Sequence, residues 1–284
     1  MPAHRLVRTL AVTGIIVAAL SACAPVSDTP GSTDPGTTTE PTYVTEGKLT
    51  IATGEPAYFP YVIDDAPESG EGFESAVAYA VADQLGFAKD DVVWVRTGFE
   101  EAIQPGPKSF DFNLQQFSIT PEREATVDFS APYYSTPQAV VTIAGTAAEG
   151  VTTIAGLKDV VIGAQTGTTS FTAAESVIQP TSGVQAFNTN DDAKLALENG
   201  SIDALVVDLP TAFYLTGVEL TDGVLVGQLP ASAGIGDEWG LLLDKDSSLT
   251  DEVSNAVNAL REDGTLDEIT EQWLGTDAGA PVLG

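Results

Sequence analysis

Residues 111–134 read DFNLQQFSITPEREATVDFSAPYY. In this stretch an apolar run ends in two glutamines and a Ser-Ile-Thr-Pro turn, and a lone arginine, Arg123, follows the turn. The chain holds 11 basic residues against 41 acidic ones, so an arginine after a strand and a turn is a scarce cation. Taken alone, Arg123 has the ordinary interpretation of a surface arginine paired with Glu122 or Glu124. Its role therefore depends on what the fold brings beside it.

Predicted strands and helices alternate on both sides of this stretch. The expected strands cover residues 49–52, 92–95, 160–164 and 204–207. The expected helices cover residues 74–85, 191–199, 249–263 and 266–274, with two more that open near Thr169 and, led by Pro210, after Asp208. This alternation predicts an α/β fold with two open sheets. A length of 284 residues and a hydrophobic content of 43% suit two domains, each with a core.

Polar residues gather where three predicted strands end. They are Gln115, Gln116 and Ser118 in the quoted stretch, Thr168 and Thr169 after the strand at 160–164, and Asp208. Ligands of open α/β sheets bind at the carboxyl ends of strands, where helix N-termini gather. The Arg123 guanidinium and free backbone N–H groups suit a carboxylate, and Asp208 suits an ammonium group. An α-amino acid carries both groups on one carbon, although each threonine alone is an ordinary helix cap and Asp208 an ordinary helix-start acid.

The first 23 residues have the pattern of a secretory leader. A short basic start precedes an apolar run at residues 10–20, and Leu-Ser-Ala-Cys follows, ending at Cys23. This ending resembles the lipobox of bacterial lipoproteins, so we expect a signal peptide at 1–22 and a lipidated N-terminus at Cys23 rather than a buried free thiol. Residues 24–46 are nearly all Pro, Ser, Thr, Gly, Asp or Glu, which predicts a disordered tether over 23–46. The folded body is expected outside the cytoplasm, held to the cell membrane by lipid.

Charge and composition exclude several classes of function. A formal net charge of −30 excludes a nucleic-acid partner, which needs a basic footprint. The only histidine is His4 and the only cysteine is Cys23, so the mature chain lacks the side chains of Ser/His/Asp and Cys/His catalysis and of nearly all zinc sites. We therefore expect no metal and no cofactor. We also expect a monomer.

A set of short motifs spans most of the chain. In order they are GFE at 72–74, FD at 110–111, SITPER at 118–123, VDFS at 127–130, PYY at 132–134, GTT at 167–169, IDALVVD at 202–208, DGTL at 263–266 and WLG at 273–275. From residue 48 to 275 their order and spacing resemble the family 3 extracellular solute-binding proteins, the polar amino acid receptors of bacterial ABC importers. The resemblance implies a two-lobed, type II periplasmic-binding-protein-like fold, with two open sheets joined by two hinge strands.

The resemblance also implies lobe boundaries and a mechanism. The first lobe is expected to hold residues 47–137 and 238–284, and the second lobe residues 138–237, with crossings near 130–137 and 235–239. A ligand that contacts both lobes stabilises the closed state. The implied function is to capture a polar amino acid by hinge closure and deliver it to an ABC permease.

Individual roles follow from the resemblance alone. Arg123 is implied to grip the α-carboxylate, with donors from Ser118, Thr168 and Thr169, and Asp208 to take the α-ammonium. Tyr58 matches the aromatic wall over the ligand side chain, although core packing would also explain it. The chain departs from the family pattern where bulky Gln115 and Gln116 replace small residues and where QPGPK at 104–108 replaces a short turn.

The ligand side chain stays open between two classes. If Glu55 faces the pocket ionised, Lys, Arg or ornithine should bind best; if it points to solvent, Gln115 and Gln116 favour an amide such as glutamine. Two rival functions are a dehydratase-like enzyme on the same fold, with Glu55 as its acid, and a ferric-ion receptor using Tyr133 and Tyr134.

Overall fold

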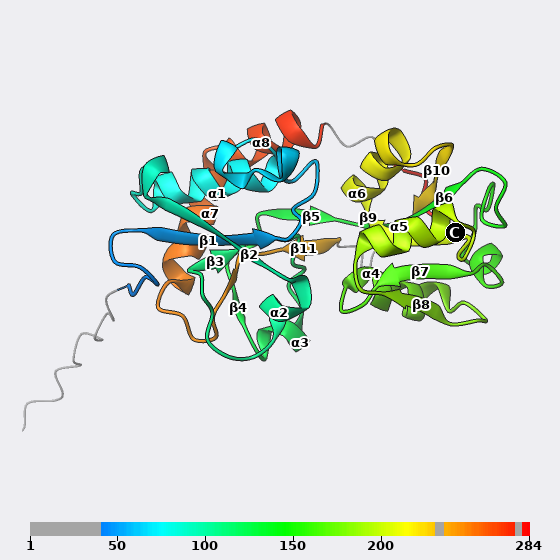
Figure 1. The fold of residues 1–284 in the computed structure, drawn as a ribbon, viewed down its shortest axis with the longest axis horizontal. Helices are drawn as coiled ribbons and strands as arrows, with labels where there is room; N and C mark the ends of the chain where they lie inside the picture. Colours follow the sequence, from blue (N-terminus) through cyan, green and yellow to red (C-terminus); the bar gives the residue numbers. More distant parts are fainter. Residues whose placement is uncertain (1–40, 231–235, 276–279) are drawn as a thin grey trace, which may run out of the picture. The chain divides into compact units, whose positions relative to one another are not determined.

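The computed structural model describes residues 41–230, 236–275 and 280–284, which form two lobes, each with its own five-stranded sheet (Figure 1). The sheet of the first lobe has the order β2-β1-β3-β12-β4. The strands are Val92–Thr97 (β2), Leu49–Gly54 (β1), Phe112–Asn113 (β3), Leu242–Leu243 (β12) and Asp128–Phe129 (β4). Because β1 pairs in parallel with both β2 and β3, the carboxyl ends of these three strands share one edge of the sheet.

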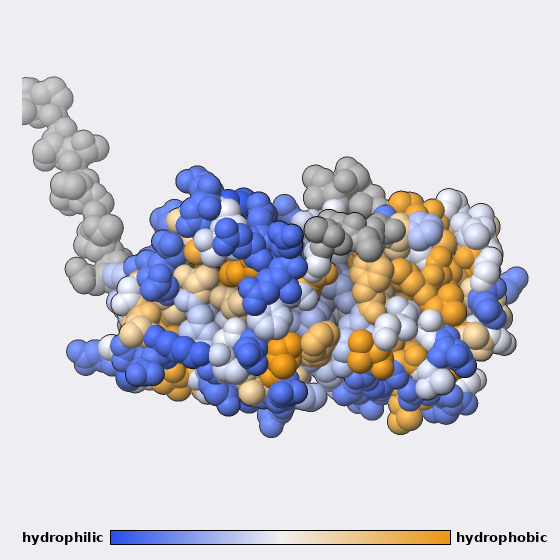
Figure 2. Space-filling view, turned by 90° about the horizontal axis from the view of Figure 1, so that it is seen from above, coloured by the Kyte–Doolittle hydropathy of each residue, from blue (hydrophilic) through white to orange (hydrophobic). Residues whose placement is uncertain are grey.

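Three helices cover the first sheet: α1 (Phe73–Gln84), α7 (Thr250–Glu262) and α8 (Thr265–Trp273). Their apolar faces meet β1 in one core cluster, in which Leu49, Ile51, Val77 and Val257 are fully buried. Seen from above, the surface over this lobe is largely hydrophilic, whereas hydrophobic residues gather over the second lobe (Figure 2). Short helices α2 (Phe99–Ile103) and α3 (Pro121–Glu124) lie beyond β2 and β3 in the chain.

The second lobe has a sheet of order β10-β6-β9-β7-β8. Its strands are Gly223–Gln228 (β10), Gln138–Ile143 (β6), Ala204–Asp208 (β9), Ile162–Gln165 (β7) and Val184–Phe187 (β8). Its helices are α4 (Thr169–Ala173), α5 (Asn190–Glu198) and α6 (Leu209–Tyr214), and π-helical turns at Ala174–Ile178 and Leu215–Glu219 extend α4 and α6. Because side chains alternate across a strand, Val207 packs in one core cluster and Val206 in another, on opposite faces of the sheet.

Several single 3-10 turns complete the described helical structure. They cover Ile63–Asp65, Pro67–Ser69, Lys89–Asp91 and Ile154–Leu157. The first of these follows β1 and holds two residues with left-handed backbone, Asp64 and Asp65, at φ of 52° and 54°. This turn closes the loop that carries Tyr58 back toward α1.

A two-stranded antiparallel ribbon connects the lobes. It pairs β5 (Tyr134–Thr136) with β11 (Asp237–Trp239), and Figure 1 shows both strands between the two sheets. Trp239 is fully buried and its ring lies 5.0 Å from that of Tyr134 and 5.6 Å from that of Tyr61. The ribbon therefore packs into an aromatic part of the first-lobe core, which fixes its position on that lobe.

The α/β fold with two open sheets and two connecting strands is the predicted one. The predicted helices and strands are present with ends shifted by up to a few residues, and glycines end two helices as expected: Gly86 after α1 and Gly200 after α5, at φ of 84° and 78°. Glycine adopts this left-handed conformation at little cost.

The expected tether extends too far at its carboxyl end. Residues 41–46 were assigned to it, yet the Tyr43 ring meets that of Phe87 at 5.0 Å, edge to face, and the Val44 N–H donates to the Asp111 carboxylate at 2.8 Å. One aromatic side chain and one backbone hydrogen bond are enough to hold these residues on the first lobe. Cys23 and the rest of residues 1–40 lie outside the described residues.

The expected second segment of the first lobe, 238–284, is wrong for its last residues. Residues 280–284 lie on the second lobe: Val282 bridges to Gln228, the Ile154 N–H donates to the Gly284 carbonyl at 2.9 Å, and Leu283 is buried in a core cluster of the second sheet. The reason is that an apolar side chain and a free β10 backbone edge meet there. Across the ranges 41–230, 236–275 and 280–284, no helix is both long and apolar enough to cross a membrane.

Candidate functional site

A cavity of about 80 Å³ lies between the lobes at the carboxyl ends of their strands. It is lined by seven of the eight residues predicted to bind the ligand: Arg123, Asp208, Ser118, Gln116, Thr168, Thr169 and Tyr58. The first lobe contributes Arg123, Ser118, Gln116 and Tyr58, and the second contributes the other three. The folding of two sheets toward each other therefore brings together residues up to 150 positions apart.

Arg123 sits in α3, whose first turn is closed by the Thr120 hydroxyl accepting from the Arg123 N–H. One guanidinium nitrogen donates to the Ser118 carbonyl at 2.6 Å, and the other donates across the cleft to the Gly167 carbonyl at 3.0 Å. The guanidinium carbon lies 5.4 Å from the Phe99 ring centroid, within range of a cation–π contact. Burial lowers the pKa of Arg123, while Asp208 and Asp237 raise it, and a guanidinium stays protonated in proteins. The site thus holds a desolvated, fixed cation.

Asp208 ends β9 and begins α6, and the residue is half-buried at the wall of the cavity. Its carboxylate accepts a hydrogen bond from the Gln138 side-chain amide at 2.7 Å. Burial, and next the charge of Asp237, raise its pKa to about 7, against the opposing effects of Gln138 and Arg123. An ammonium group would stabilise the ionised carboxylate.

Hydroxyl groups of the two lobes meet directly at the cleft. Ser118 and Thr169 share a hydrogen bond of 3.0 Å. Thr168 caps α4 by accepting from the Phe171 N–H at 3.1 Å and donates to the Gln165 carbonyl at 2.6 Å. The residues that open α4, Thr168, Thr169 and Ser170, therefore line the cavity together with Arg123.

Two aromatic residues of the β1 loop also reach the second lobe. The Tyr58 hydroxyl donates to the Asp191 carboxylate at 3.1 Å, and the Tyr61 hydroxyl shares a hydrogen bond of 2.8 Å with Thr211. Burial raises the pKa of Tyr58, as do Asp191 and its hydrogen bond. Tyr58 is therefore a wall of the cleft with its hydroxyl held, and it stays protonated at neutral pH.

Gln116 lies in the cavity but has a structural partner. Its backbone is left-handed at φ 51°, and both its N–H groups, main chain and side chain, donate to the Glu74 carboxylate, the first at 2.7 Å. Glu74 also accepts from the Tyr133 hydroxyl at 2.5 Å. Burial raises the pKa of Glu74 to about 7 even though these hydrogen bonds lower it. The Gln116 amide is thus held at Glu74 at the N-terminal end of α1.

Glu55 is the one predicted residue that the cavity does not include. It is exposed and lines a neighbouring hollow of about 280 Å³ together with Glu100 and Glu101. Tyr58 and Phe99 belong to the walls of both spaces. Glu55 therefore lies at the mouth of the cleft, in a hollow next to the cavity that Arg123 lines.

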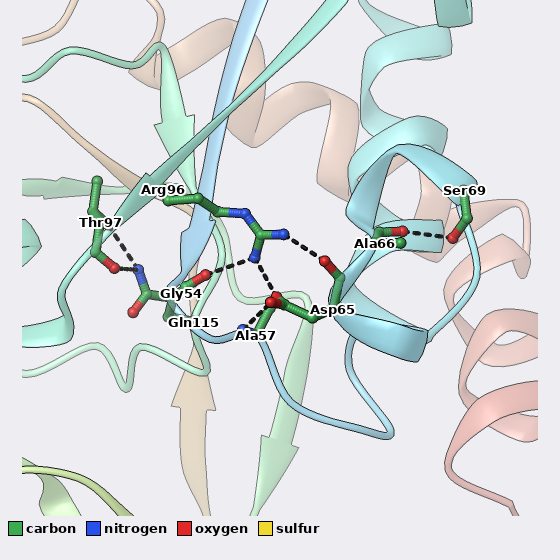
Figure 3. Close-up of polar contacts among 8 residues, drawn as sticks. All are labelled: Gly54, Ala57, Asp65, Ala66, Ser69, Arg96, Thr97 and Gln115. Carbon is green, nitrogen blue, oxygen red and sulfur yellow. Dashed lines mark hydrogen bonds and ion pairs between the residues drawn. The ribbon is translucent and has the colours of Figure 1, made fainter.

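The loop that carries Glu55 is held by polar contacts at the end of β2 (Figure 3). Arg96 donates to the Gly54 carbonyl at 2.8 Å and pairs with Asp65 at 2.6 Å. Gln115 donates from its amide to the Thr97 hydroxyl at 2.8 Å. The Gln115 amide group, which was expected to face a ligand side chain, is therefore hydrogen-bonded to Thr97.

Sequence reasoning missed two residues that line the cavity, Glu74 and Phe99, and a third, Gln138, that bonds to Asp208 behind it. Glu74 was visible only as the end of the GFE motif, and nothing local marked it as a buried acid. Phe99 opens α2 and had no signal, because a lone aromatic residue after a strand is ordinary. Gln138 carried no signal either, since its partners lie far along the chain. Within the described residues, no group of three or more acidic, His or Cys side chains is arranged to hold a metal.

Tyr133 and Tyr134 do not face a common ligand. The Tyr133 hydroxyl donates to Glu74, and the ring of Tyr134 packs on Phe73 and Trp239 at 5.2 and 5.0 Å. The geometry gives no support to a ferric-ion site at this pair.

Several known amino acid-binding proteins are similar to this chain. The L-arginine-binding protein of Pseudomonas aeruginosa is 28% identical over 245 residues, which cover 84% of this chain and 92% of that protein. An ancestral arginine-binding protein solved with bound glutamine has a TM-score of 0.67 and 28% identity, over 82% of this chain and all of its own. An ancestral amino acid-binding protein described as a precursor of cyclohexadienyl dehydratase has a TM-score of 0.65 and 29% identity, over 80% and 95% of the two chains.

The family match covers nearly all of the two lobes. Residues 49–276 match the bacterial extracellular solute-binding proteins, family 3. This range contains every residue around the cavity, and it is well over half of the 284 residues. The chain therefore belongs to the bacterial extracellular solute-binding proteins of family 3.

Proposed function

We propose that this protein is the substrate-binding component of an ABC importer and captures a polar α-amino acid between its lobes. The observation that carries the proposal is that Arg123 and Asp208, a buried cation and a half-buried acid from different lobes, line the same cavity. A ligand with adjacent carboxylate and ammonium groups matches both charges at once.

The backbone of the ligand is placed by charge. Arg123 holds the α-carboxylate with help from the Ser118 hydroxyl and the N–H groups at the start of α4, where Thr168 and Thr169 lie. The ligand carboxylate takes over the guanidinium hydrogen that is now donated to Gly167, so an intramolecular contact between lobes is exchanged for one through the ligand. Asp208 accepts from the α-ammonium. Contacts with both lobes favour the closed state, which the permease reads.

The ligand side chain lies between Tyr58 and Phe99 and is cationic. From the cavity, these rings lead to the hollow lined by Glu55, Glu100 and Glu101. An arginine or lysine side chain gains from aromatic faces and from the negative field of this hollow. An acidic side chain would add a like charge to a cleft that already contains Glu74 and Asp208. We therefore prefer a ligand with a cationic side chain to one with an amide side chain.

The same residues argue for binding rather than catalysis. A dehydratase needs an acid free to transfer a proton to the substrate. Glu55 is exposed, and the buried Glu74 accepts three hydrogen bonds from Gln116 and Tyr133. Neither acid has the freedom and the enclosure that the reaction needs.

The protein works outside the cytoplasm as a monomer, tied to the membrane through lipid on Cys23. This part of the proposal rests on the Leu-Ser-Ala-Cys sequence at 20–23 and on the tether composition. The partners are the amino acid, the permease and the membrane surface.

Calorimetric titration of the purified body with arginine, glutamine and glutamate tests the proposal, with prephenate turnover measured in parallel. We expect arginine to bind most tightly, glutamate not to bind, and prephenate to remain unchanged. Glu55→Gln should weaken arginine binding about two- to fivefold while leaving glutamine binding unchanged, as expected for one solvent-screened charge. Glu46→Gln, an exposed acid at the start of the first lobe, is the matched control. Absence of amino acid binding, or turnover of prephenate, would reject the proposed function.

A further inference from the structure

One side chain at the cleft is bonded to two carboxylates. The Gln138 side-chain amide nitrogen donates to Asp208 at 2.7 Å and to Asp237 at 2.8 Å. Its oxygen accepts from the Ser170 hydroxyl at 2.6 Å, and only 6% of the residue is exposed. A turned amide would place its oxygen against two carboxylates, which only accept, so the amide nitrogen faces both acids and also lies 3.4 Å from the Thr169 hydroxyl.

The two acids come from different parts of the fold. Gln138 opens β6 and pairs with Asp208 of β9 in the second sheet. Asp237 opens β11 of the connecting ribbon and pairs with Thr136 of β5. The Gln138 amide thus connects Asp208, the acid proposed to bind the ligand ammonium group, to β11, a strand that joins the lobes.

We propose that Asp237 is a positioning residue of the ammonium site: through the Gln138 amide it fixes the direction of Asp208, and it places a second negative charge behind the bound ammonium group. This inference rests on the proposed function, because it takes a ligand ammonium at Asp208 as given. Asp237 does not line the cavity itself, so it acts through Gln138 and through its electric field.

The electrostatic effect can be separated from the other charges around Asp208. The titratable and charged groups that act on it are Asp237 from the ribbon, Arg123 from α3, Glu74 from α1, and the Tyr61 and Tyr133 hydroxyls. Burial is the largest cause of the raised pKa of Asp208, and the Asp237 charge is the next. Removal of the Asp237 charge therefore lowers the pH at which Asp208 ionises and becomes able to pair with an ammonium group.

Asp237→Asn is the sharpest variant, because its side-chain oxygen can still accept from Gln138 while the charge is gone. Arginine affinity is measured calorimetrically from pH 5 to 9. Above pH 8 we expect a three- to tenfold weaker affinity, since one negative charge near the ligand cation is lost. The midpoint of the acid limb should move to lower pH. Asp237→Ala serves as a second variant if the asparagine protein does not fold, and it should lose both the charge and the acceptor.

Glu238→Gln is the matched control. Glu238 follows Asp237 on the same strand, so its side chain points to the opposite face, and it is exposed. The Glu238→Gln variant should have the arginine affinity of the wild type and the same midpoint of the acid limb. The inference is overturned if arginine binds Asp237→Asn with unchanged affinity and midpoint, or if Glu238→Gln has the same effect. If the wild type binds no amino acid at any pH, the proposed function fails and this inference fails with it.

Discussion

Asp208 must satisfy two requirements that oppose each other. It has to be buried to bind an ammonium group strongly, and it has to be ionised to bind it at all. Burial and the neighbouring Asp237 charge raise its pKa to about 7, so at pH 6 most unliganded molecules carry a proton there. Arrival of an ammonium group displaces that proton.

Amino acid affinity should therefore rise with pH from 5 to about 7 and level off above. In the rising part the affinity changes up to about tenfold per pH unit if one proton must leave. Calorimetry in two buffers of different ionisation enthalpy at pH 6 should show proton release on binding. An affinity that is the same at pH 5.5 and pH 8 would contradict this prediction.

The charges of Arg123 and Asp208 should each be essential for binding and not for folding. Arg123→Ala and Asp208→Ala each leave the other partner or the ligand group unpaired, which costs roughly 2–5 kcal/mol, or tens to thousands of fold in affinity. Glu122→Ala, which removes an exposed charge from the same helix α3, is the control and should bind normally. Wild-type affinity in either charge variant, with a normal unfolding transition, would be the contrary result.

At the scale of elements, α1 begins with an acid in an unusual position. Glu74 is 1% exposed and holds Gln116 and Tyr133, so it connects α1 to the strand end before Ser118 and to the ribbon that joins the lobes. Burial raises its pKa to about 7, above the ordinary value for a carboxyl group in the unfolded chain. Between about pH 4.5 and 7 the folded protein thus binds a proton that the unfolded chain does not, and stability decreases as pH rises through this range.

Glu74→Gln should flatten that dependence. In the unliganded wild type, the midpoint of thermal unfolding should fall from pH 5 to pH 8, in part because the acidic chain repels itself more strongly as pH rises. That general contribution is shared by Glu71→Gln, an exposed neighbour before α1. The prediction is a smaller slope for Glu74→Gln than for Glu71→Gln, measured by calorimetry, and equal slopes would show that Glu74 does not titrate in this range.

At the scale of the whole molecule, the lobes meet through polar contacts more than through a shared core. Described contacts across the cleft include Ser118 with Thr169, Arg123 with Gly167 and Tyr61 with Thr211, and each core cluster belongs to one lobe, with the chain end at 280–284 packed on the second. Hydrogen bonds to water replace such contacts at small net cost. A ligand that contacts both lobes can therefore shift the balance between the open and the closed cleft.

Cys23→Ser should release the body from the membrane fraction, because the proposed lipid anchor has no other attachment point in the sequence. The expected result is a soluble protein with unchanged amino acid affinity, measured by fractionation and calorimetry. A variant that stays wholly with the membrane would place the anchor elsewhere.

The sequence by itself determined the local structure and the family. Glycine stops and Pro210 act on groups within a few positions of themselves, so the ends of α1 and α5 and the start of α6 were predictable from neighbouring residues. The motif order along 48–275 was sufficient for the fold class, because each motif marks a strand end or a helix start. The predicted residues Arg123 and Asp208 lie at such ends.

Only the tertiary structure decided which side chains share an environment. The Glu74 bonds to Gln116 span 42 positions, and the Gln138 bonds to Asp208 and Asp237 span 70 and 99. Nothing near these residues in the chain specifies the partner, since the partner is brought by sheet order and by the ribbon between the lobes. The place of Glu55 at the cleft mouth and of residues 280–284 on the second lobe has the same cause: burial and hydrogen bonding are satisfied in space, not along the chain.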